Sequence, residues 1–104
     1  MKQIPISDLK KKLDLQESPV LIDVRQPEEH AVFNIGGILL PLGDIVSMQV
    51  DAIEEYRNSE VICYCRSGQR SMQACMMLES MGFTNVSNLS GGMLAWQEAY
   101  GSGS

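Results

Sequence analysis

The sequence has no long apolar run, no excess of positive charge and no apolar segment at its N-terminus. None of its apolar runs approaches the roughly 18 consecutive residues that a transmembrane helix needs. The formal net charge of -5 at pH 7 argues against general affinity for nucleic acid. Because the first residues also lack the apolar core of a signal peptide, we expect a cytoplasmic protein without nucleic-acid or membrane partners.

Cysteine and histidine are scarce, with three copies and one copy respectively. An odd number of cysteines in a reducing compartment argues against a disulfide framework. Cys63 and Cys65 stand two positions apart in a predicted strand, about 7 Å from each other, which is too far for a relaxed disulfide. His30 is distant from both in the sequence, and no pair of ligand doublets is present. We therefore expect no metal and no cofactor, with Cys63 and Cys75 packed in the core.

Strand and helix signals alternate along the chain, whose composition of 44% apolar and 20% charged residues is typical of a globular domain. Apolar runs predict strands near residue 4, at 20–24, 38–40 and 61–64, and within 83–89. Helices are expected over 7–13 with Ser7 as N-cap, from 27, from Asp44 as N-cap toward 56, over 72–81, and after 92. This order predicts an α/β fold, a small, doubly wound, mostly parallel sheet with helices on both faces. We place this domain at residues 1–100 and a flexible tail at 101–104.

The most informative segment is the heptad Cys65-Arg66-Ser67-Gly68-Gln69-Arg70-Ser71. It lies between an apolar strand and a predicted helix, at the edge where ligands of parallel sheets bind. Backbone N–H groups of the loop and of the helix N-terminus favour negative charge there, and two arginines add to this effect. Such surroundings lower a cysteine's pKa from roughly 8.5 to about 3.5–7.5, so we expect Cys65 to be a thiolate nucleophile. The alternative, a structural cysteine, does not need two arginines and a glycine around it.

The helix predicted over 72–81 is rich in methionine. Because the spacing of these residues follows one broad helical face, we expect core positions for the later Trp96 and for Met72, Met76, Met77 and Met81. A methionine near the cysteine loop is an alternative candidate for the mouth of a pocket.

Three blocks of the sequence, in order, resemble those of a known family. They are Leu21-Ile22-Asp23-Val24-Arg25-Gln26-Pro27-Glu28-Glu29, the heptad from Cys65, and Leu89-Ser90-Gly91-Gly92-Met93-Leu94-Ala95-Trp96. The match covers roughly residues 4–100, and the chain is similar to a single-domain rhodanese, a sulfurtransferase homology domain. The family commonly has a histidine before an Ile-Pro-Gly-Ala turn, whereas this chain has Asn34-Ile35-Gly36-Gly37-Ile38. Asn34 can hold such a turn, and residues 34–42 are similar to rhodanese domains attached to the adenylating enzymes of thiamine and molybdopterin synthesis.

The resemblance implies a two-step sulfur transfer through Cys65. The thiolate takes a sulfane sulfur from a donor and becomes a persulfide, and a nucleophilic acceptor then removes the outer sulfur. The loop N–H groups would form an anion nest, with arginines directed at the anionic donor or acceptor. The substrate-binding residues that this implies are Arg66, Ser67, Gly68, Gln69 and Arg70.

Three further polar residues are assigned supporting roles. Ser71 either donates a hydroxyl hydrogen bond to the site or caps the helix that follows. Arg25 follows a strand and can pair with Asp23, Glu28 or Glu29. We therefore expect Asp23 and Arg25 to brace loops rather than to contact substrate.

The small size of the domain predicts a cysteine loop that is open to solvent. The implied donor is a small anion such as thiosulfate, and exchange with a protein sulfur donor, such as a cysteine desulfurase, or with a protein acceptor is a further hypothesis. Two other functions stay open. One is a docking or regulatory module without catalysis, although such modules typically lack the cysteine. The other is a cysteine phosphatase or arsenate reductase, although phosphatases carry five residues between cysteine and arginine and this chain has four.

Overall fold

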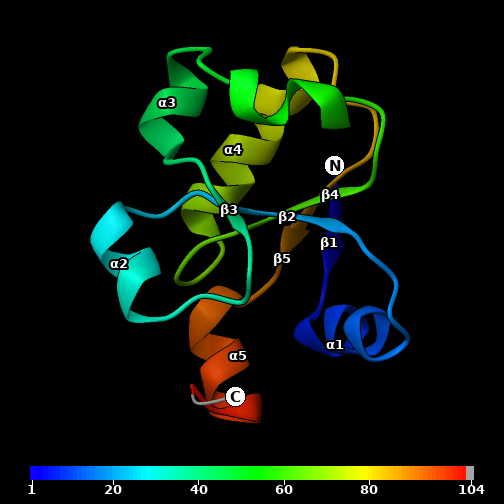
Figure 1. Cartoon of the computed structure of the whole chain (residues 1–104), viewed down its shortest axis with the longest axis vertical. Coiled ribbons are helices and arrows are strands. Elements are labelled where there is room, and N and C mark those ends of the chain that lie inside the picture. Colours follow the sequence, from blue (N-terminus) through cyan, green and yellow to red (C-terminus); the bar gives the residue numbers. More distant parts are fainter. Residues whose placement is uncertain (103–104) are drawn as a thin grey trace.

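Five short parallel strands form the centre of the molecule, in the order β1-β5-β4-β2-β3 (Figure 1). The structure is a computed structural model that describes residues 1–102. Its strands are β1 (Lys2–Ile4), β2 (Val20–Asp23), β3 (Ile38–Leu39), β4 (Val61–Tyr64) and β5 (Val86–Leu89). Its helices are α1 (Ile6–Asp14), α2 (Pro27–Val32), α3 (Leu42–Val46), the 3-10 helix η1 (Asp51–Tyr56), α4 (Gln69–Ser80) and α5 (Gly92–Tyr100). Every strand pairing in the described residues is parallel, and the predicted α/β fold is confirmed.

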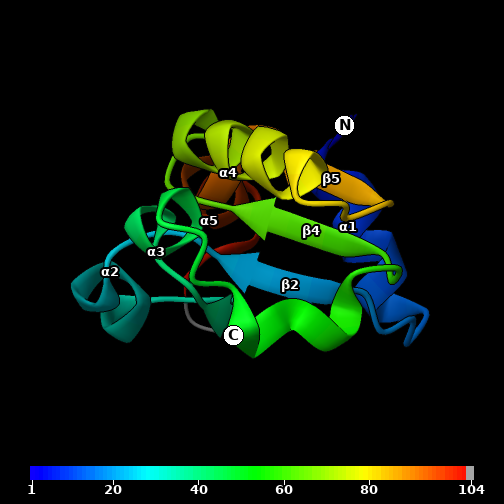
Figure 2. The ribbon, with the colours of Figure 1, turned by 90° about the horizontal axis from the view of Figure 1, so that it is seen from above.

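Strand β4 lies in the middle of the sheet, as its unbroken apolar run predicts. All four of its residues are buried. On one side Tyr64 is in register with Asp23 of β2, and on the other Cys63 is in register with Asn88 of β5. The carboxyl ends of these three strands therefore meet at one edge, and Figure 2 shows β2 and β4 pointing the same way toward it.

Each face of the sheet carries its own core, because successive strand residues point to opposite sides. One core contains Cys63 and Cys65 with residues of α3, η1 and α4. The other contains Ile62 and Tyr64 with residues of α1 and α5. Figure 1 shows α3 and α4 above the sheet and α1 and α5 below it. All three cysteines are buried, so Cys63 and Cys75 lie in the core as expected.

Prolines explain two of the helix starts that differ from the prediction. Helix α1 begins after Pro5, so Ser7 is not its N-cap. The single helix expected from Asp44 is two elements, α3 after Pro41 and η1 further on. Pro5 and Pro41 stand at the N-caps of α1 and α3 with an extended backbone, where a proline costs the helix no hydrogen bond because it needs no N–H there. Met48 separates the two later elements, and its φ of 61° lies in the left-handed region, where a right-handed helix cannot continue.

Helix α4 begins three residues earlier than predicted, with Gly68 at its N-cap. Its buried residues are Ser71, Ala74, Cys75 and Leu78. Met77 and Met81 pack partly against this core, and Trp96 is buried in the other one. Met72 and Met76 are 40% and 59% exposed, so their predicted core position is wrong. The stripe that faces the sheet is made mostly of small residues, and the longer methionines lie beside it.

None of the helices in residues 1–102 combines the length and the apolar character that a membrane crossing requires. Gly101 and Ser102 follow α5, and the rest of the predicted tail, residues 103–104, lies outside the described part of the chain.

Candidate functional site

Cys65 is the first residue after β4, at the carboxyl edge of the sheet. It is only 1% exposed, so the prediction of an open cysteine is wrong for the sulfur itself. The strand's alternation turns the Cys65 side chain toward the α4 face, where the loop closes over it. Around it, Arg66, Ser67 and Gln69 are exposed, and they form the outer rim of the loop.

Three hydrogen-bond donors surround the sulfur of Cys65. The Gly68 N–H lies 3.1 Å from Sγ, and the Ser71 N–H and hydroxyl lie 3.4 Å and 3.3 Å from it. Burial raises the pKa of the Cys65 thiol, but the bonds from Ser71 and from the Gly68 and Ser67 N–H groups outweigh it. The pKa of Cys65 therefore lies below its ordinary value, and the loop is built to stabilise a thiolate.

The turn that directs these N–H groups inward depends on Gly68. Its φ of 102° lies in the left-handed region, which costs glycine little and other residues much more. As the N-cap of α4, Gly68 leads directly into the first turn of the helix, which supplies the Ser71 N–H. The unpaired N–H groups of a helix start are thus directed at the sulfur.

The N-terminus of α5 holds the loop from the other side. The Met93 N–H donates to the Cys65 carbonyl and the Leu94 N–H donates to the Arg66 carbonyl, both at 2.9 Å. A Cβ on Gly92 would lie 2.4 Å from that Cys65 oxygen, so only glycine permits this approach. This contact explains why the final helix begins with Gly92.

Ser71 belongs to the sulfur site and not to a helix cap. Helix α4 has Gly68 at its N-cap, and Ser71 is fully buried, with its hydroxyl near both Cys65 Sγ and the side-chain oxygen Oδ1 of Asn88. Asn88 also donates from Nδ2 to the Gly68 carbonyl at 3.2 Å and to Gln3 Oε1 at 2.9 Å. Sequence reasoning missed Asn88 and Gln3. The one available signal was a polar pair, Ser87 and Asn88, inside a strand with apolar ends.

Asp23 and Arg25 form a buried ion pair beside the loop. Arg25 Nε and Nη2 lie 2.9 Å and 2.8 Å from the Asp23 carboxylate, and His30 Nδ1 lies 2.8 Å from the same group. Burial raises the pKa of Asp23, but the hydrogen bonds from Arg25 and His30 outweigh it and hold the pKa below its ordinary value. Of the three partners considered for Arg25, the structure selects Asp23. Arg25 also donates to the Phe33 carbonyl. No local pattern indicated the contact between His30 and Asp23.

Arg70 is directed at Glu29 of α2. Its Nη1 and Nη2 lie 2.7 Å and 2.8 Å from the two carboxylate oxygens, a bidentate pair. The hydrogen bond with Arg70 lowers the pKa of Glu29 to about 2. This pair connects α2 with the first turn of α4, so the guanidinium predicted to meet substrate is partly engaged by a carboxylate. Arg66 is exposed on the rim.

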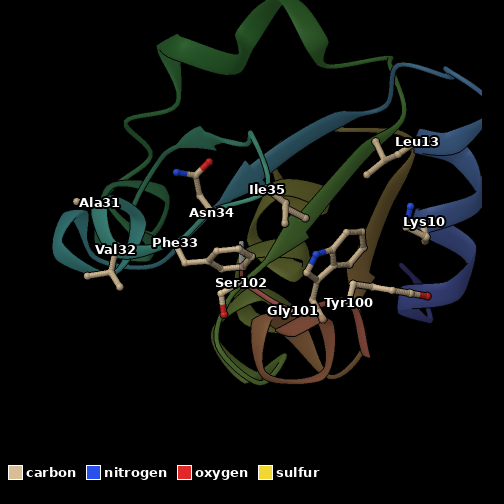
Figure 3. A pocket seen from close by; sticks show the side chains of 11 residues that line it. Lys10, Leu13, Ala31, Val32, Phe33, Asn34, Ile35, Tyr100, Gly101 and Ser102 are labelled. Atoms are coloured by element: carbon tan, nitrogen blue, oxygen red, sulfur yellow. The ribbon is translucent and has the colours of Figure 1, made fainter. Parts of the chain in front are cut away.

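Two hollows lie near these elements. The smaller, about 220 Å³, adjoins the cysteine loop, and its lining residues are Gln3, Ser67, Gly68, Gln69, Met72, Asn88, Ser90 and Gly91. Met72 is thus the methionine at the mouth. The larger, about 650 Å³, is lined by residues such as Leu13 of α1, Phe33 after α2, and Trp96 and Tyr100 of α5 (Figure 3). None of residues 65–71 is among its described lining, so the chemistry is assigned to the loop and not to the larger cavity.

Across residues 1–102, no three histidine, cysteine, aspartate or glutamate side chains gather in a way that could hold a metal ion.

The fold and the loop define an α/β domain with a buried, anion-stabilised cysteine, and comparison with known proteins places it further. The rhodanese-like domain family matches residues 6–99. A putative sulfurtransferase YtwF from Bacillus subtilis is 38% identical, with 93% of this chain and 91% of that protein covered. A sulfurtransferase from Allochromatium vinosum is also 38% identical, over 90% of this chain and 86% of that protein. The crystal structure of a rhodanese-like domain protein from Staphylococcus aureus superposes with a TM-score of 0.81 at 31% identity, covering 92% and 91% of the two chains. The chain belongs to the rhodanese-like family, and these relatives make it a member of a sulfurtransferase family.

Proposed function

We propose that this protein carries sulfane sulfur as a persulfide on Cys65 and passes it to a nucleophilic acceptor. The observation that carries this proposal is the set of three donors around Sγ, which favours an anion at the one cysteine that faces the loop. The family membership supports the same class of chemistry. Thiosulfate as a donor and cyanide as an acceptor are the small molecules with which we expect the activity to be measured.

Neither step of the proposed reaction needs a cofactor. The Cys65 thiolate attacks the outer sulfur of thiosulfate, the S–S bond of the donor breaks, and sulfite leaves with the electron pair. The product is a persulfide whose negative charge rests on the terminal sulfur. An acceptor such as cyanide then attacks that terminal sulfur, and the Cys65 thiolate leaves, ready for another cycle. The leaving group of the second step is the low-pKa thiolate that the loop stabilises.

The rim of the loop is the proposed contact for donor and acceptor. Arg66 is an exposed cation next to the cysteine and would attract an anionic donor. Ser67 and Gln69, also exposed, would offer neutral hydrogen bonds, and Gly68 supplies a backbone N–H. Arg70 keeps N–H groups beyond the two directed at Glu29, and these are its proposed link to the substrate anion.

We further propose that the donor or acceptor in the cell is a protein, so that the chain acts as a sulfur relay. The exposed rim of Arg66, Ser67 and Gln69 supports this, because a partner can reach the loop without entering a deep cleft. A cysteine desulfurase is the class of enzyme that would supply sulfur in this form.

Intact-protein mass spectrometry tests the proposal, with Cys65→Ser as the matched control. Incubation with thiosulfate should add one sulfur atom to the wild type, cyanide should remove it, and the variant should gain nothing. If only a cysteine desulfurase with free cysteine loads the protein, the relay is supported and thiosulfate is excluded as donor. If neither loads it, the chain is a non-catalytic module. Hydrolysis of p-nitrophenyl phosphate that depends on Cys65 would indicate a phosphatase instead.

A further inference from the structure

The Ser71 hydroxyl has one proton to donate and two acceptors within reach. Cys65 Sγ lies 3.3 Å from Ser71 Oγ, and Asn88 Oδ1 lies close to the same oxygen. Ser71 is fully buried and Asn88 is only 1% exposed. Bulk water therefore cannot replace either acceptor, and the hydroxyl must choose between the sulfur and the amide.

The amide of Asn88 has a fixed orientation. Its Nδ2 donates to the Gly68 carbonyl at 3.2 Å and to Gln3 Oε1 at 2.9 Å. A rotated amide would set its oxygen against two other oxygens and its NH₂ group against the Ser71 hydroxyl. The two accepting oxygens therefore require that Oδ1 faces Ser71.

The two chemical states of Cys65 differ in how well Sγ accepts a hydrogen bond. A thiolate carries a full negative charge on Sγ and is a strong acceptor. In a persulfide, Sγ has two covalent bonds and the charge rests on the outer sulfur. A hydroxyl that stayed directed at Sγ would then lose most of its hydrogen bond in a buried site, which is costly.

We propose that Asn88 is a positioning residue. Its amide oxygen accepts the hydrogen bond of the Ser71 hydroxyl while Cys65 carries the transferred sulfur, and the hydroxyl donates to Sγ again once that sulfur has left. This inference rests on the proposed persulfide on Cys65. No covalent bond changes in this movement, because the proton stays on Ser71 Oγ and only its acceptor changes. Asn88 thereby stabilises the loaded form relative to the free thiolate.

Asn88→Leu is the variant that isolates this role. Leucine is of similar size and offers no acceptor. The Gly68 carbonyl keeps its bond from the Met72 N–H at 3.1 Å, and Gln3 Oε1 keeps its bond from the Ser90 hydroxyl at 3.1 Å. The Ser71 hydroxyl is then the group that loses its alternative partner.

The experiment poises each protein in mixtures of thiosulfate and sulfite and measures the loaded fraction by intact mass. At a fixed ratio of the two anions, we expect the loaded-to-free ratio of Asn88→Leu to fall on the order of tenfold relative to the wild type, because one buried hydroxyl is left unpaired in the loaded state. Removing that hydroxyl should repair the defect, so the double variant with Ser71→Ala should load better than Asn88→Leu alone. Asn85→Leu is the matched control, because its side-chain oxygen has no hydrogen-bond partner within residues 1–102.

A second readout separates this role from simple loosening of the loop. In Asn88→Leu the Ser71 hydroxyl has no competing acceptor and donates to the Cys65 thiolate, so the pH midpoint of Cys65 alkylation should fall. Arg70 and Cys63, the charged and titratable groups that interact with this sulfur, are unchanged in the variant. A loosened loop would instead raise the midpoint and would not be rescued by Ser71→Ala.

The outcomes distinguish the inference from the function on which it rests. If the wild type gains no sulfur, the proposed function fails and this inference with it. If the wild type loads and Asn88→Leu loads equally well, or its midpoint rises, the inference is refuted and the function stands. If Asn88→Leu does not fold, the loaded-to-free ratio of the single variant Ser71→Ala tests the inference. This variant should raise the ratio, because the free form loses a hydrogen bond to a charged thiolate whereas the loaded form loses only the neutral one to Asn88 Oδ1. An unchanged or lower ratio refutes the inference.

Discussion

Replacing Gly92 by alanine tests how the final helix sets the shape of the cysteine loop. The new Cβ would lie 2.4 Å from the Cys65 carbonyl oxygen and 2.7 Å from that of Arg66, both backbone atoms. Either this clash persists or α5 moves away from the loop. Moving away breaks the two 2.9 Å bonds that Met93 and Leu94 donate to the same carbonyls.

The expected loss of stability follows from two separate costs. The φ of Gly92 is 56°, and a left-handed conformation costs an L-residue with a side chain roughly 1–2 kcal/mol. The clash, or the two hydrogen bonds that are lost when it is relieved, costs about 1–3 kcal/mol more. We therefore expect the free energy of unfolding to fall by about 2–5 kcal/mol, a large part of the stability of a small domain.

Urea unfolding measures this loss, and Gly36→Ala is the matched control. Gly36 has a φ of 92°, but its Cβ would meet no heavy atom within 4 Å. The control therefore loses only the stability that the strained backbone conformation costs. Gly92→Ala should lose about 1–3 kcal/mol more than the control. It should also raise the pH midpoint of Cys65 alkylation, because the loop loses its support. Equal losses in the two variants, with an unchanged midpoint, would refute this account of the contact.

Three further variants test the surroundings of the loop. Arg70→Ala should raise the pH midpoint of Cys65 alkylation and weaken the use of thiosulfate, and an unchanged midpoint would show that the loop N–H groups set it alone. The pKa of Glu29 is lowered from 4.5 to about 2, so its pairing stabilises the fold above pH 4.5 and is lost as the pH falls toward 2. Glu29→Gln should lack this contribution, roughly 0.2–1 kcal/mol because the pair is about one-third exposed. The free energy of unfolding of this variant should therefore approach that of the wild type as the pH falls, and a difference that stays constant would contradict the prediction. Tyr64→Phe removes the acceptor of the Gly37 N–H at 3.2 Å, and denaturant unfolding should show a loss of about 1 kcal/mol or more.

The strands and the cysteine loop could be predicted because their signals are local. The run before Cys65 is apolar without interruption, and the glycine and arginines that follow have few uses outside an anion-binding turn. The helix starts at Ile6 and Leu42 could not be found as readily, since the prolines before them compete with Ser7 and Asp44 as start signals. In these cases the proline is the N-cap and the helix begins at the next residue.

Contacts made across the sheet could not be predicted from neighbouring residues. Asn88 reaches Gly68 because β4 and β5 are in register, and His30 reaches Asp23 because α2 folds back over the edge. The burial of Cys65 was missed for the same reason, since its side chain packs in the core that α3, η1 and α4 form on one face of the sheet. The roles assigned to the loop residues, and the cytoplasmic location, stay predictions.

The N-termini of two helices meet at Cys65 and together favour a negative charge on its sulfur. The N-terminus of α4 is directed at Cys65 Sγ, and the N-terminus of α5 is directed at the Cys65 carbonyl. The positive ends of both helix dipoles therefore lie close to Cys65. Salt weakens the pull of an exposed arginine such as Arg66, but it screens buried backbone dipoles far less. The acidity of Cys65 thus rests on buried donors, the loop N–H groups and the Ser71 hydroxyl, and the exposed side chains of the rim can vary without removing them.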